Sequence, residues 1–269
     1  TVLVKVLYFG GGSSPYPKYL TNVNGVVFFS ADDGFNSVEL WKSDGSTAGT
    51  IQVKDIYFGQ NQSSSPERLT NVNGTLFFHA DDGINGKELW KSDGTSAGTV
   101  LVKDIKSGSG SGVDLNAQYM TNVNGTLFFQ GMESTNGREL WKSDGTALGT
   151  IMVKDINVGL SSSPNLFTNV NGTVFFIAND GTSSVNDGEL WKSDGTSAGT
   201  VLIKDIKAGA GSSQPLLLTD VNGVLFFAAD DGINGYSLWK SDGTLAGTIL
   251  VKTGITPSSL ININGTIFF

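Results

Sequence analysis

The residues best suited to chemistry are side-chain oxygens that recur on a short, glycine-containing turn. The turn reads ADDGFNS once and ADDGING twice, so an adjacent pair of aspartates is followed closely by an asparagine. Calcium binds closely spaced carboxylate and amide oxygens, but it takes about six to eight of them, and each turn offers fewer. A calcium site and a hairpin turn without an ion therefore both fit. The candidate residues are Asp32, Asp33, Asn36, Asp81, Asp82, Asn85, Asp230, Asp231 and Asn234.

Two copies of the surrounding sequence lack this turn. At the same place the third copy reads GMESTNG and the fourth reads NDGTSSVNDG. Any site built on the turn is therefore expected more than once but in fewer than five copies. Calcium is the one cofactor that the sequence suggests.

The usual catalytic combinations are missing from the sequence. It contains a single histidine, His79, and no cysteine, which leaves no partner set for a catalytic triad or a zinc site. Carboxylate pairs of the kind used in glycoside hydrolysis stay open, because spacing along the chain does not give distance in space. An acidic residue repeated in each copy is nevertheless a poor candidate for a single active site. The sequence predicts a protein that is not an enzyme.

A repeat of about 50 residues organises the chain. Tryptophan marks it, and each tryptophan follows a leucine. This period matches the roughly 40–50 residues of a four-stranded propeller blade and is too long for leucine-rich or ankyrin repeats. The tryptophans are Trp41, Trp90, Trp141, Trp191 and Trp239.

One copy, residues 68–105, divides into four expected strands. They read RLTNV, TLFFHA, KELWK and TVLVKDI. Asn73-Gly74 between the first two favours a two-residue type I′ hairpin, because both residues tolerate positive φ. The uninterrupted apolar run TLFFHA fits a strand buried on both faces, and no window has a helical period. The sequence therefore predicts an all-β protein, a β-propeller of four-stranded blades.

Two repeated residues are best explained by the scaffold. The tryptophan has a fixed place in a central strand, which favours packing between blades over stacking on a ligand. The aspartate of each SDG is expected to cap its own turn, with glycine taking the positive φ.

The repeated motif resembles that of the bacterial ELWxxDGT tandem-repeat proteins, also called hyalin-like. It stands as Glu39-Leu40-Trp41 with Asp44-Gly45, and as Glu88-Leu89-Trp90 with Asp93-Gly94-Thr95. It recurs at Glu139 to Thr146 and at Glu189 to Thr196, and the last copy has Ser237 in place of the glutamate. The resemblance implies a secreted or surface-attached bacterial protein, and it implies no reaction.

The repeats are expected to form a single propeller domain over residues 1–269. The expected units are about 1–49, 50–98, 99–149, 150–199 and 200–247, with a partial sixth over 248–269. The chain opens with an expected outer strand, TVLVKV, and closes with an expected inner pair, LININ and GTIFF. Six blade positions with an incomplete last blade are favoured, and a five-bladed ring with spare terminal strands is the alternative.

Charge and hydropathy argue against two kinds of partner. The net charge is −8 and the pI about 4.6, with lysines spread along the repeats instead of clustered. Nucleic acids and anionic membranes need clustered basic residues, so neither is an expected partner. No stretch approaches the roughly 20 apolar residues of a membrane-spanning helix.

The repeats differ most in the connections between one outer strand and the next inner strand. These connections are expected on the same face as the ADDG turns, and they carry the aromatic residues Tyr8, Tyr57, Phe58 and Tyr119. Aromatic rings beside aspartate and asparagine suit sugars, so we expect a multivalent binding or adhesion module for a polysaccharide or cell-surface glycan. The alternative is a structural coat or spacer protein without a small ligand, with or without stabilisation by calcium. Self-association stays open.

Overall fold

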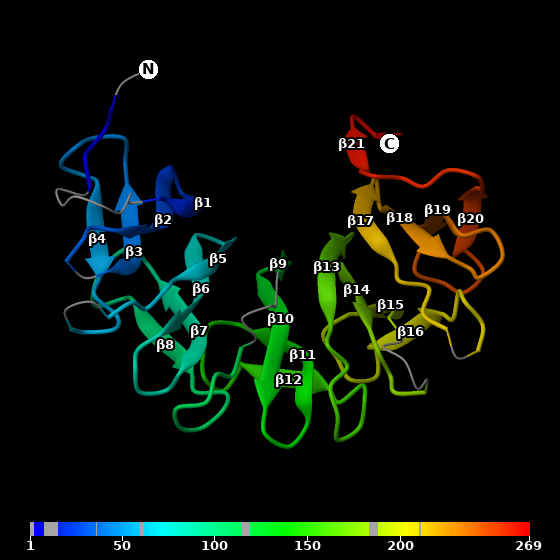
Figure 1. Cartoon of the computed structure of the whole chain (residues 1–269), viewed down its shortest axis with the longest axis horizontal. Coiled ribbons are helices and arrows are strands. Elements are labelled where there is room, and N and C mark those ends of the chain that lie inside the picture. Colours follow the sequence, from blue (N-terminus) through cyan, green and yellow to red (C-terminus); the bar gives the residue numbers. More distant parts are fainter. Residues whose placement is uncertain are drawn as a thin grey trace. The chain divides into compact units, whose positions relative to one another are not determined.

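The computed structural model describes residues 3–7, 16–35, 37–59, 62–113, 119–182, 188–209 and 211–269. Two candidate residues, Tyr8 and Asn36, lie outside them. All regular elements in the described residues are strands (Figure 1). No helix in these ranges is long and apolar enough to cross a membrane.

Five antiparallel sheets, each of four consecutive strands, follow one another along the chain. The first contains β1 (Lys18–Val23), β2 (Val26–Asp32), β3 (Val38–Ser43) and β4 (Ile51–Lys54). The second contains β5 (Glu67–Val72), β6 (Thr75–Asp81), β7 (Lys87–Ser92) and β8 (Val100–Lys103). The third contains β9 (Met120–Val123), β10 (Thr126–Glu133), β11 (Gly137–Ser143) and β12 (Ile151–Lys154).

The last two four-stranded sheets and a short hairpin complete the fold. The fourth sheet contains β13 (Asn165–Val170), β14 (Thr173–Ala178), β15 (Glu189–Ser193) and β16 (Val201–Lys204). The fifth contains β17 (Leu216–Val221), β18 (Val224–Asp230), β19 (Tyr236–Ser241) and β20 (Ile249–Lys252). β21 (Ile261–Ile263) pairs with β22 (Thr266–Phe268) as a two-stranded sheet. Five four-stranded repeats and a partial sixth confirm the predicted fold class.

The contacts group the chain into two compact units. Unit 1 comprises Thr1–Leu115 and Asp144–Thr150, and so holds the first two sheets and the loop between β11 and β12. Unit 2 comprises Asn116–Ser143 and Ile151–Phe269, and so holds the other three sheets and the β21–β22 hairpin. The single domain over 1–269 and the closure of the ring stay predictions.

The sheets are offset from the repeat units expected from the sequence. The expected boundary near residue 49 falls between β3 and β4, and the one near residue 98 falls between β7 and β8. A period fixes the length of a repeat and not its phase, which accounts for the offset. The structural repeat therefore ends after the lysine that closes its outer strand.

The first hairpin of each sheet has the predicted turn. In the fourth sheet β13 and β14 pair at Val170 and Thr173, which leaves Asn171 and Gly172 as a two-residue loop. Their φ values of 49° and 80° are both positive, as a type I′ turn requires. Asn73 and Gly74 have the same geometry, with φ values of 50° and 86°.

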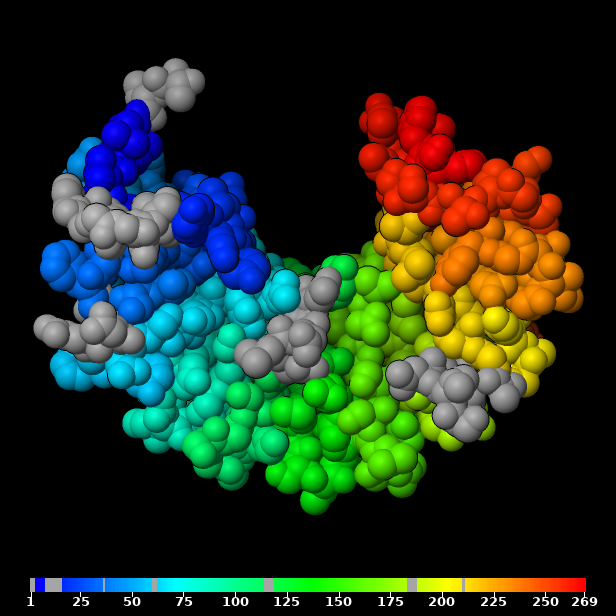
Figure 2. Space-filling model, in the orientation of Figure 1, coloured from blue at the N-terminus to red at the C-terminus, as the bar shows by residue number. Residues whose placement is uncertain are grey.

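Apolar packing between sheets uses the tryptophans as predicted. In unit 2, Trp191 and Phe176 of the fourth sheet cluster with Phe128 and Leu140 of the third. Trp191 is only 6% exposed, so most of its ring surface is removed from water. Figure 2 shows the green, yellow and orange sheets of unit 2 side by side in chain order. The prediction of packing between blades is confirmed within each unit, because Trp90 packs in the same way on the first sheet.

Lysines tie each of the first four sheets to the SDGT loop of the following repeat. In unit 2 the Nζ of Lys142 donates to the carbonyl oxygen of Gly195 at 2.8 Å, and Lys154 donates to that of Thr200 at 2.8 Å. The loop itself is closed by Asp194, which accepts hydrogen bonds from the N–H and the hydroxyl of Thr196. In unit 1, Lys42 and Lys54 bind the carbonyls of Gly94 and Thr99. The turn-capping role predicted for the SDG aspartate is confirmed.

The expected N-terminal strand is not formed in residues 3–7. An outer strand pairs with the third strand of its own sheet, and residues 3–7 pair with no strand among the described residues. The segment still lies against the first SDG loop, because Lys5 Nζ donates to Thr50 O at 2.7 Å and Thr47 donates to Val4 O at 2.7 Å. Lys5 therefore makes the same kind of lysine-to-carbonyl hydrogen bond as the lysines of the sheets, although residues 3–7 form no strand.

We predict that replacing Trp90 by alanine lowers the free energy of unfolding by about 3–5 kcal/mol, as large aromatic deletions from a core do. Urea unfolding followed by circular dichroism measures the loss. Leu148→Ala is the control, since Leu148 is 93% exposed and its removal should change the midpoint little. Equal stability of the two variants would contradict a packing role for Trp90.

A matched glycine pair separates backbone strain from crowding in the Asn-Gly turns. Gly25 and Gly223 have φ values of 86° and 84°, but a Cβ at Gly25 meets open space, whereas one at Gly223 would overlap the amide of Asn171. Gly25→Ala should cost about 1–2 kcal/mol from the left-handed backbone alone. Gly223→Ala should cost about 1–3 kcal/mol more because of the overlap. Thermal unfolding compares them, and equal losses would show that the stacking of successive turns adds nothing.

Candidate functional site

The glutamate of each ELW holds the connection that leads to the next sheet. Glu39 lies on β3 and is fully buried. Its Oε2 accepts hydrogen bonds from the N–H of Ile56 at 3.0 Å and from the hydroxyl of Ser64 at 2.6 Å, and its Oε1 accepts the N–H of Ser64 at 2.8 Å. The two ends of the connection are thereby fixed to one carboxyl group.

Sequence reasoning gave this glutamate no role, although a signal was present. In unit 2, Glu139 binds Ile156 and Ser162 as Glu39 binds Ile56 and Ser64. A serine therefore follows the glutamate 23 to 25 residues later in the chain in these repeats. The fifth repeat has the fully buried Ser237 instead, and the segment that follows it differs from the other connections. A search of the sequence for a serine downstream of each ELW glutamate would have indicated that the glutamate holds the connection.

Burial changes the acidity of these glutamates. It raises the pKa of Glu39, Glu88 and Glu139 from 4.5 to about 7, although the hydrogen bonds to each carboxyl act in the opposite direction. Burial, together with the charge of Asp33, also raises the pKa of Asp55. Acidic groups therefore lie close together beneath the turn of the first sheet.

The second aspartate of each ADDGING turn closes the turn on itself. In unit 1, Asp82 Oδ1 accepts the N–H groups of Ile84 and Asn85 at 2.9 and 2.8 Å, and its Oδ2 accepts the amide of Asn85 at 2.8 Å. Asp231 makes the same three bonds in unit 2. Hydrogen bonds from the N–H and side-chain amide of Asn234 hold the pKa of Asp231 below its usual value.

The first aspartate of the ADDGING turn accepts fewer hydrogen bonds from the turn than the second does. Asp81 Oδ1 accepts the N–H of Gly83 at 2.7 Å, and Asp32 Oδ1 accepts that of Gly34 at 2.7 Å. Asp33 accepts the N–H of Phe35 at 2.9 Å. In the described part of the chain no three acidic or histidine side chains are placed to hold a metal ion. Calcium binding stays a prediction.

The connections do meet the acidic turns, as the sequence predicted. In unit 1 the ring of Tyr57 lies directly over Gly83, so closely that a Cβ there would overlap it. In unit 2 the corresponding residue of the last connection is Lys207, whose Nζ lies 2.8 Å from Asp230 Oδ2. Asn157 takes the same place over Gly181. The turns of the second, fourth and fifth sheets are therefore faced by a tyrosine, an asparagine and a lysine, respectively.

The other predicted aromatic residues among those described are exposed. Phe58 is 87% exposed in unit 1, next to Tyr57 in the chain. Tyr119 belongs to unit 2, is 40% exposed, and lines a pocket beside Leu166 and Leu216. Tyr57 and Phe58 belong to unit 1 and Tyr119 to unit 2, so the shared aromatic rim stays a prediction.

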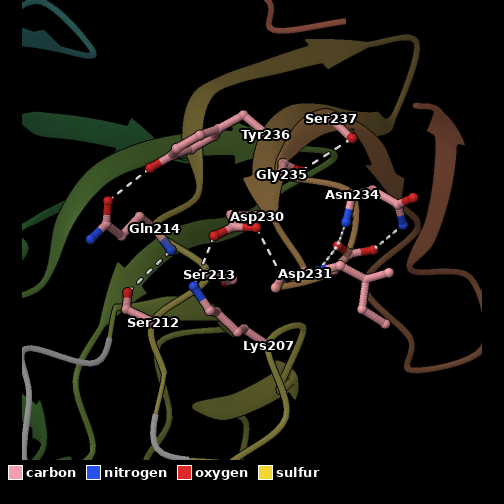
Figure 3. A network of polar contacts seen from close by, with 12 residues as sticks. Lys207, Ser212, Ser213, Gln214, Asp230, Asp231, Asn234, Gly235, Tyr236 and Ser237 are labelled. Carbon is pink, nitrogen blue, oxygen red and sulfur yellow. Dashed lines mark hydrogen bonds and ion pairs between the residues drawn. The ribbon is translucent and has the colours of Figure 1, made fainter. Parts of the chain in front are cut away.

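A polar network joins the last connection to the turn of the fifth sheet (Figure 3). Tyr236 donates its hydroxyl hydrogen to Gln214 Oε1 at 2.7 Å. Ser212 Oγ accepts the N–H of Gln214 at 3.1 Å and donates to the carbonyl of Gly188 at 3.1 Å. The ion pair of Lys207 with Asp230 lies in the same network. These bonds position the connection beside a pocket.

That pocket lies between two successive connections of unit 2 and has a volume of about 440 Å³. Serine and side-chain amides form part of its wall, and aliphatic groups form the rest. The sequence did not single out these residues, because the serine-rich connections look like solvated linkers. The lining residues are Ser161, Ser162, Ser163, Asn165, Leu166, Ile177, Ala178, Asn179, Gly188, Ser212, Gln214, Pro215 and Leu216.

Comparison with known proteins supports the fold class. No known family and no curated protein matches the sequence. Among solved structures, a mutant of puromycin hydrolase complexed with PGG matches 90% of this chain at 15% identity with a TM-score of 0.51. A putative TolB from Agrobacterium tumefaciens matches 84% of this chain and 76% of its own at 9% identity with a TM-score of 0.42. The fold is that of a β-propeller.

The match to a hydrolase corrects one prediction. The chain spans 38% of the length of the puromycin hydrolase, and at 15% identity the likeness concerns the fold alone. The sequence predicted a protein that is not an enzyme, and that prediction is contradicted, because this fold occurs in a hydrolase. The prediction rested on the lack of partners for a triad or a zinc site and on the repetition of acidic residues. Repetition constrains the scaffold and leaves the connections free to carry chemistry.

The buried glutamates predict an unusual dependence of stability on pH. Their pKa is about 7 in the folded protein and 4.5 as the ordinary value, so between these pH values the folded state binds more protons than the unfolded state. The free energy of unfolding should therefore fall as pH rises from 4.5 to 7 and level off above 7. The limit is about 1.4 kcal/mol per pH unit per group, reduced by solvent screening. Chemical denaturation at pH 5, 6, 7 and 8 measures the slope.

A pair of variants tests whether the buried glutamates cause this dependence of stability on pH. Glu39→Gln removes one titrating group and should flatten the pH dependence, whatever it does to stability overall. Glu133→Gln is the control, because Glu133 lies at the partly exposed end of β10 and should leave the slope unchanged. A wild-type protein that gains stability from pH 5 to pH 7 would contradict the assignment.

Proposed function

We propose that the protein is a multivalent binding module of a bacterial surface or secreted protein, and that it binds polysaccharide or cell-surface glycan. The face that carries this role combines the repeated acidic turns with the connections. The observation behind the proposal is the contact of different connection residues with two turns of the same sequence, ADDGING, as with Tyr57 on Gly83 and Lys207 on Asp230. The surface location rests on the resemblance to ELWxxDGT proteins.

The chemistry of the turn in unit 1 suits a sugar. The ring of Tyr57 lies beside a turn that carries Asp81 and Asp82. A pyranose has an apolar C–H face that packs on an aromatic ring, and hydroxyl groups that donate to carboxylates in charge-assisted hydrogen bonds. Ring and carboxylates thus offer the two kinds of contact that one sugar needs.

Repetition explains how shallow sites would give useful affinity. A single turn buries little of a ligand, so binding to a free monosaccharide should be weak. Several sites on one chain that meet a polymer gain about 10²–10⁴ in apparent affinity when they engage together. A polysaccharide or cell surface is therefore a more suitable partner than a small free sugar.

A spacer or coat protein is the second candidate, and one observation favours it. Both carboxylate oxygens of Asp82 accept hydrogen bonds from the turn itself, which is what a purely structural turn needs. A spacer of this kind has no small ligand. Binding experiments with and without calcium separate the two candidates.

We predict that the chain binds selected glycans on an array and binds the corresponding polysaccharide far more tightly than the monosaccharide. The double variant Asp82→Ala with Asp231→Ala opens two of the repeated turns and should abolish this binding. Surface plasmon resonance on immobilised polysaccharide measures the loss, in calcium and in chelator. Calcium dependence would extend the proposal to the candidate metal residues.

A matched control addresses the stability of the variants. Asp93→Ala with Asp242→Ala removes two turn-capping aspartates from the same two repeats, at the SDGT loops, where they accept hydrogen bonds from Thr95 and Thr244. This control should retain glycan binding. Loss of binding in both double variants, or an array without any bound glycan, would favour the spacer.

A further inference from the structure

All described residues that line the pocket between the two connections of unit 2 are uncharged. Its walls contain serines, side-chain amides and aliphatic groups, and none of its described lining residues is acidic or basic. The chain as a whole carries a net charge of −8, so a neutral pocket of about 440 Å³ is a distinct environment on it. Pockets of this size hold small molecules, and the absence of charge in the lining favours a neutral ligand.

The amide groups of the pocket have capacity left for a ligand. Gln214 uses Oε1 to accept the hydroxyl of Tyr236, which leaves its Nε2 as a donor. Asn179 uses Oδ1 to accept the N–H of Gly181, which also leaves its Nδ2 as a donor. Asn165 donates from Nδ2 to the carbonyl of Ser163, which leaves its Oδ1 as an acceptor. Hydroxyl groups both donate and accept, so a polyol matches this mixture.

The rest of the same pocket is apolar. Leu166, Ile177, Pro215 and Leu216 contribute aliphatic surface to it. A pyranose ring is amphipathic in the same sense, because its axial C–H groups form an apolar face and its hydroxyls form a polar edge. The pocket therefore offers one wall for each side of a neutral sugar ring.

A second pocket, also of about 440 Å³, adjoins the first and is mainly apolar. The two share Leu166 and Leu216 in their walls, and the second adds Tyr119, Phe167, Thr168, Leu217 and Leu218. A ligand that fills both needs an uncharged polar part and an apolar part joined directly to it.

Backbone bulges shape the shared wall. The register of β13 shifts between Asn165 and Thr168, and that of β17 shifts between Leu216 and Thr219. Within these bulges Leu166 and Leu217 have φ values of 55° and 60°, in the left-handed region that leucine rarely adopts. Bulges re-aim side chains, and here they occur in the two strands that contribute Leu166, Leu216 and Leu217 to the pockets.

We propose that the two adjoining pockets form one site for a neutral glycoside, with the sugar in the serine- and amide-lined pocket and an apolar aglycone against Tyr119 and Leu217. The inference rests on the proposed function, because it names the site and ligand class of a carbohydrate-binding chain. It is more specific than that function, since it excludes acidic sugars and requires an apolar substituent at the anomeric position.

Isothermal titration of the whole chain with paired glycosides tests the site. The probes are the methyl and hexyl forms of β-D-glucopyranoside, β-D-galactopyranoside and α-D-mannopyranoside, together with methyl β-D-glucuronide. Each buried methylene adds roughly fourfold in affinity, so at least one hexyl glycoside should bind about tenfold or more tightly than its methyl form. The charged glucuronide should bind more weakly than the neutral methyl glycosides.

Two variants locate the ligand. Gln214→Ala removes a donor of the sugar pocket and should weaken the methyl and hexyl forms by the same factor. Leu216→Ser alters the shared wall, where Leu216 is 44% exposed, and should remove the advantage of the hexyl form. Leu245→Ser is the control, because Leu245 is 66% exposed on an SDGT loop and should leave both affinities unchanged. Melting temperatures confirm that each variant is folded.

The outcomes distinguish this site from the wider proposal. Equal affinities for the methyl and hexyl forms, equal effects of Leu216→Ser and Leu245→Ser, or no binding by any of the three pairs would overturn the site. If the glycan array still shows binding in any of these cases, the proposed function stands without it. An array without bound glycan, together with no binding of the six neutral probes, would overturn both.

Discussion

A buried carboxyl group holds each connection in place, and both candidate sites depend on it. Glu39 on β3 binds the two ends of the connection that carries Tyr57 to the next turn. Hydrogen bonds to such groups contribute about 1.5–3 kcal/mol each when the carboxyl is ionised, and its loss would leave buried N–H groups without acceptors. In unit 2, Glu139 fixes Ser162, and the two neighbouring serines form part of the wall of the polar pocket. The buried glutamates on the third strand of a sheet thus determine where the connections lie on the surface.

Packing within each unit follows from the shape of a single repeat. A four-stranded sheet with a second strand as apolar as TVFFIA cannot bury both faces by itself, so it is stable only against a neighbour. Trp191 fills the space between the fourth sheet and the third, and two lysines tie the same pair of sheets at the SDGT loop. Apolar contact and charge-assisted hydrogen bonds therefore act at the same interface, one at its centre and one at its end.

The sequence was sufficient to predict local structure where a residue type has one strongly preferred backbone conformation or environment. Asn73-Gly74 predicts a type I′ turn because few other residues tolerate two successive positive φ values, and the apolar run that follows predicts a buried strand. It was insufficient for Glu39, whose partners lie in a connection that it reaches only after folding. The pocket walls were hidden for the same reason, since Ser163 and Gln214 come together from two different connections. The exclusion of catalysis failed because a repeated motif describes the scaffold and not what the connections carry.

The lysine ties have a consequence for how such a chain can grow. The acceptor of Lys54 is the main-chain carbonyl of Thr99, and that of Lys154 is the carbonyl of Thr200. A carbonyl is supplied by any residue, so the joint between two repeats does not require a matched pair of side chains. A gene segment that encodes one repeat can therefore be duplicated, deleted or exchanged with another without a compensating change next to it. The loops that differ between repeats then supply the variation, while the joint remains the same.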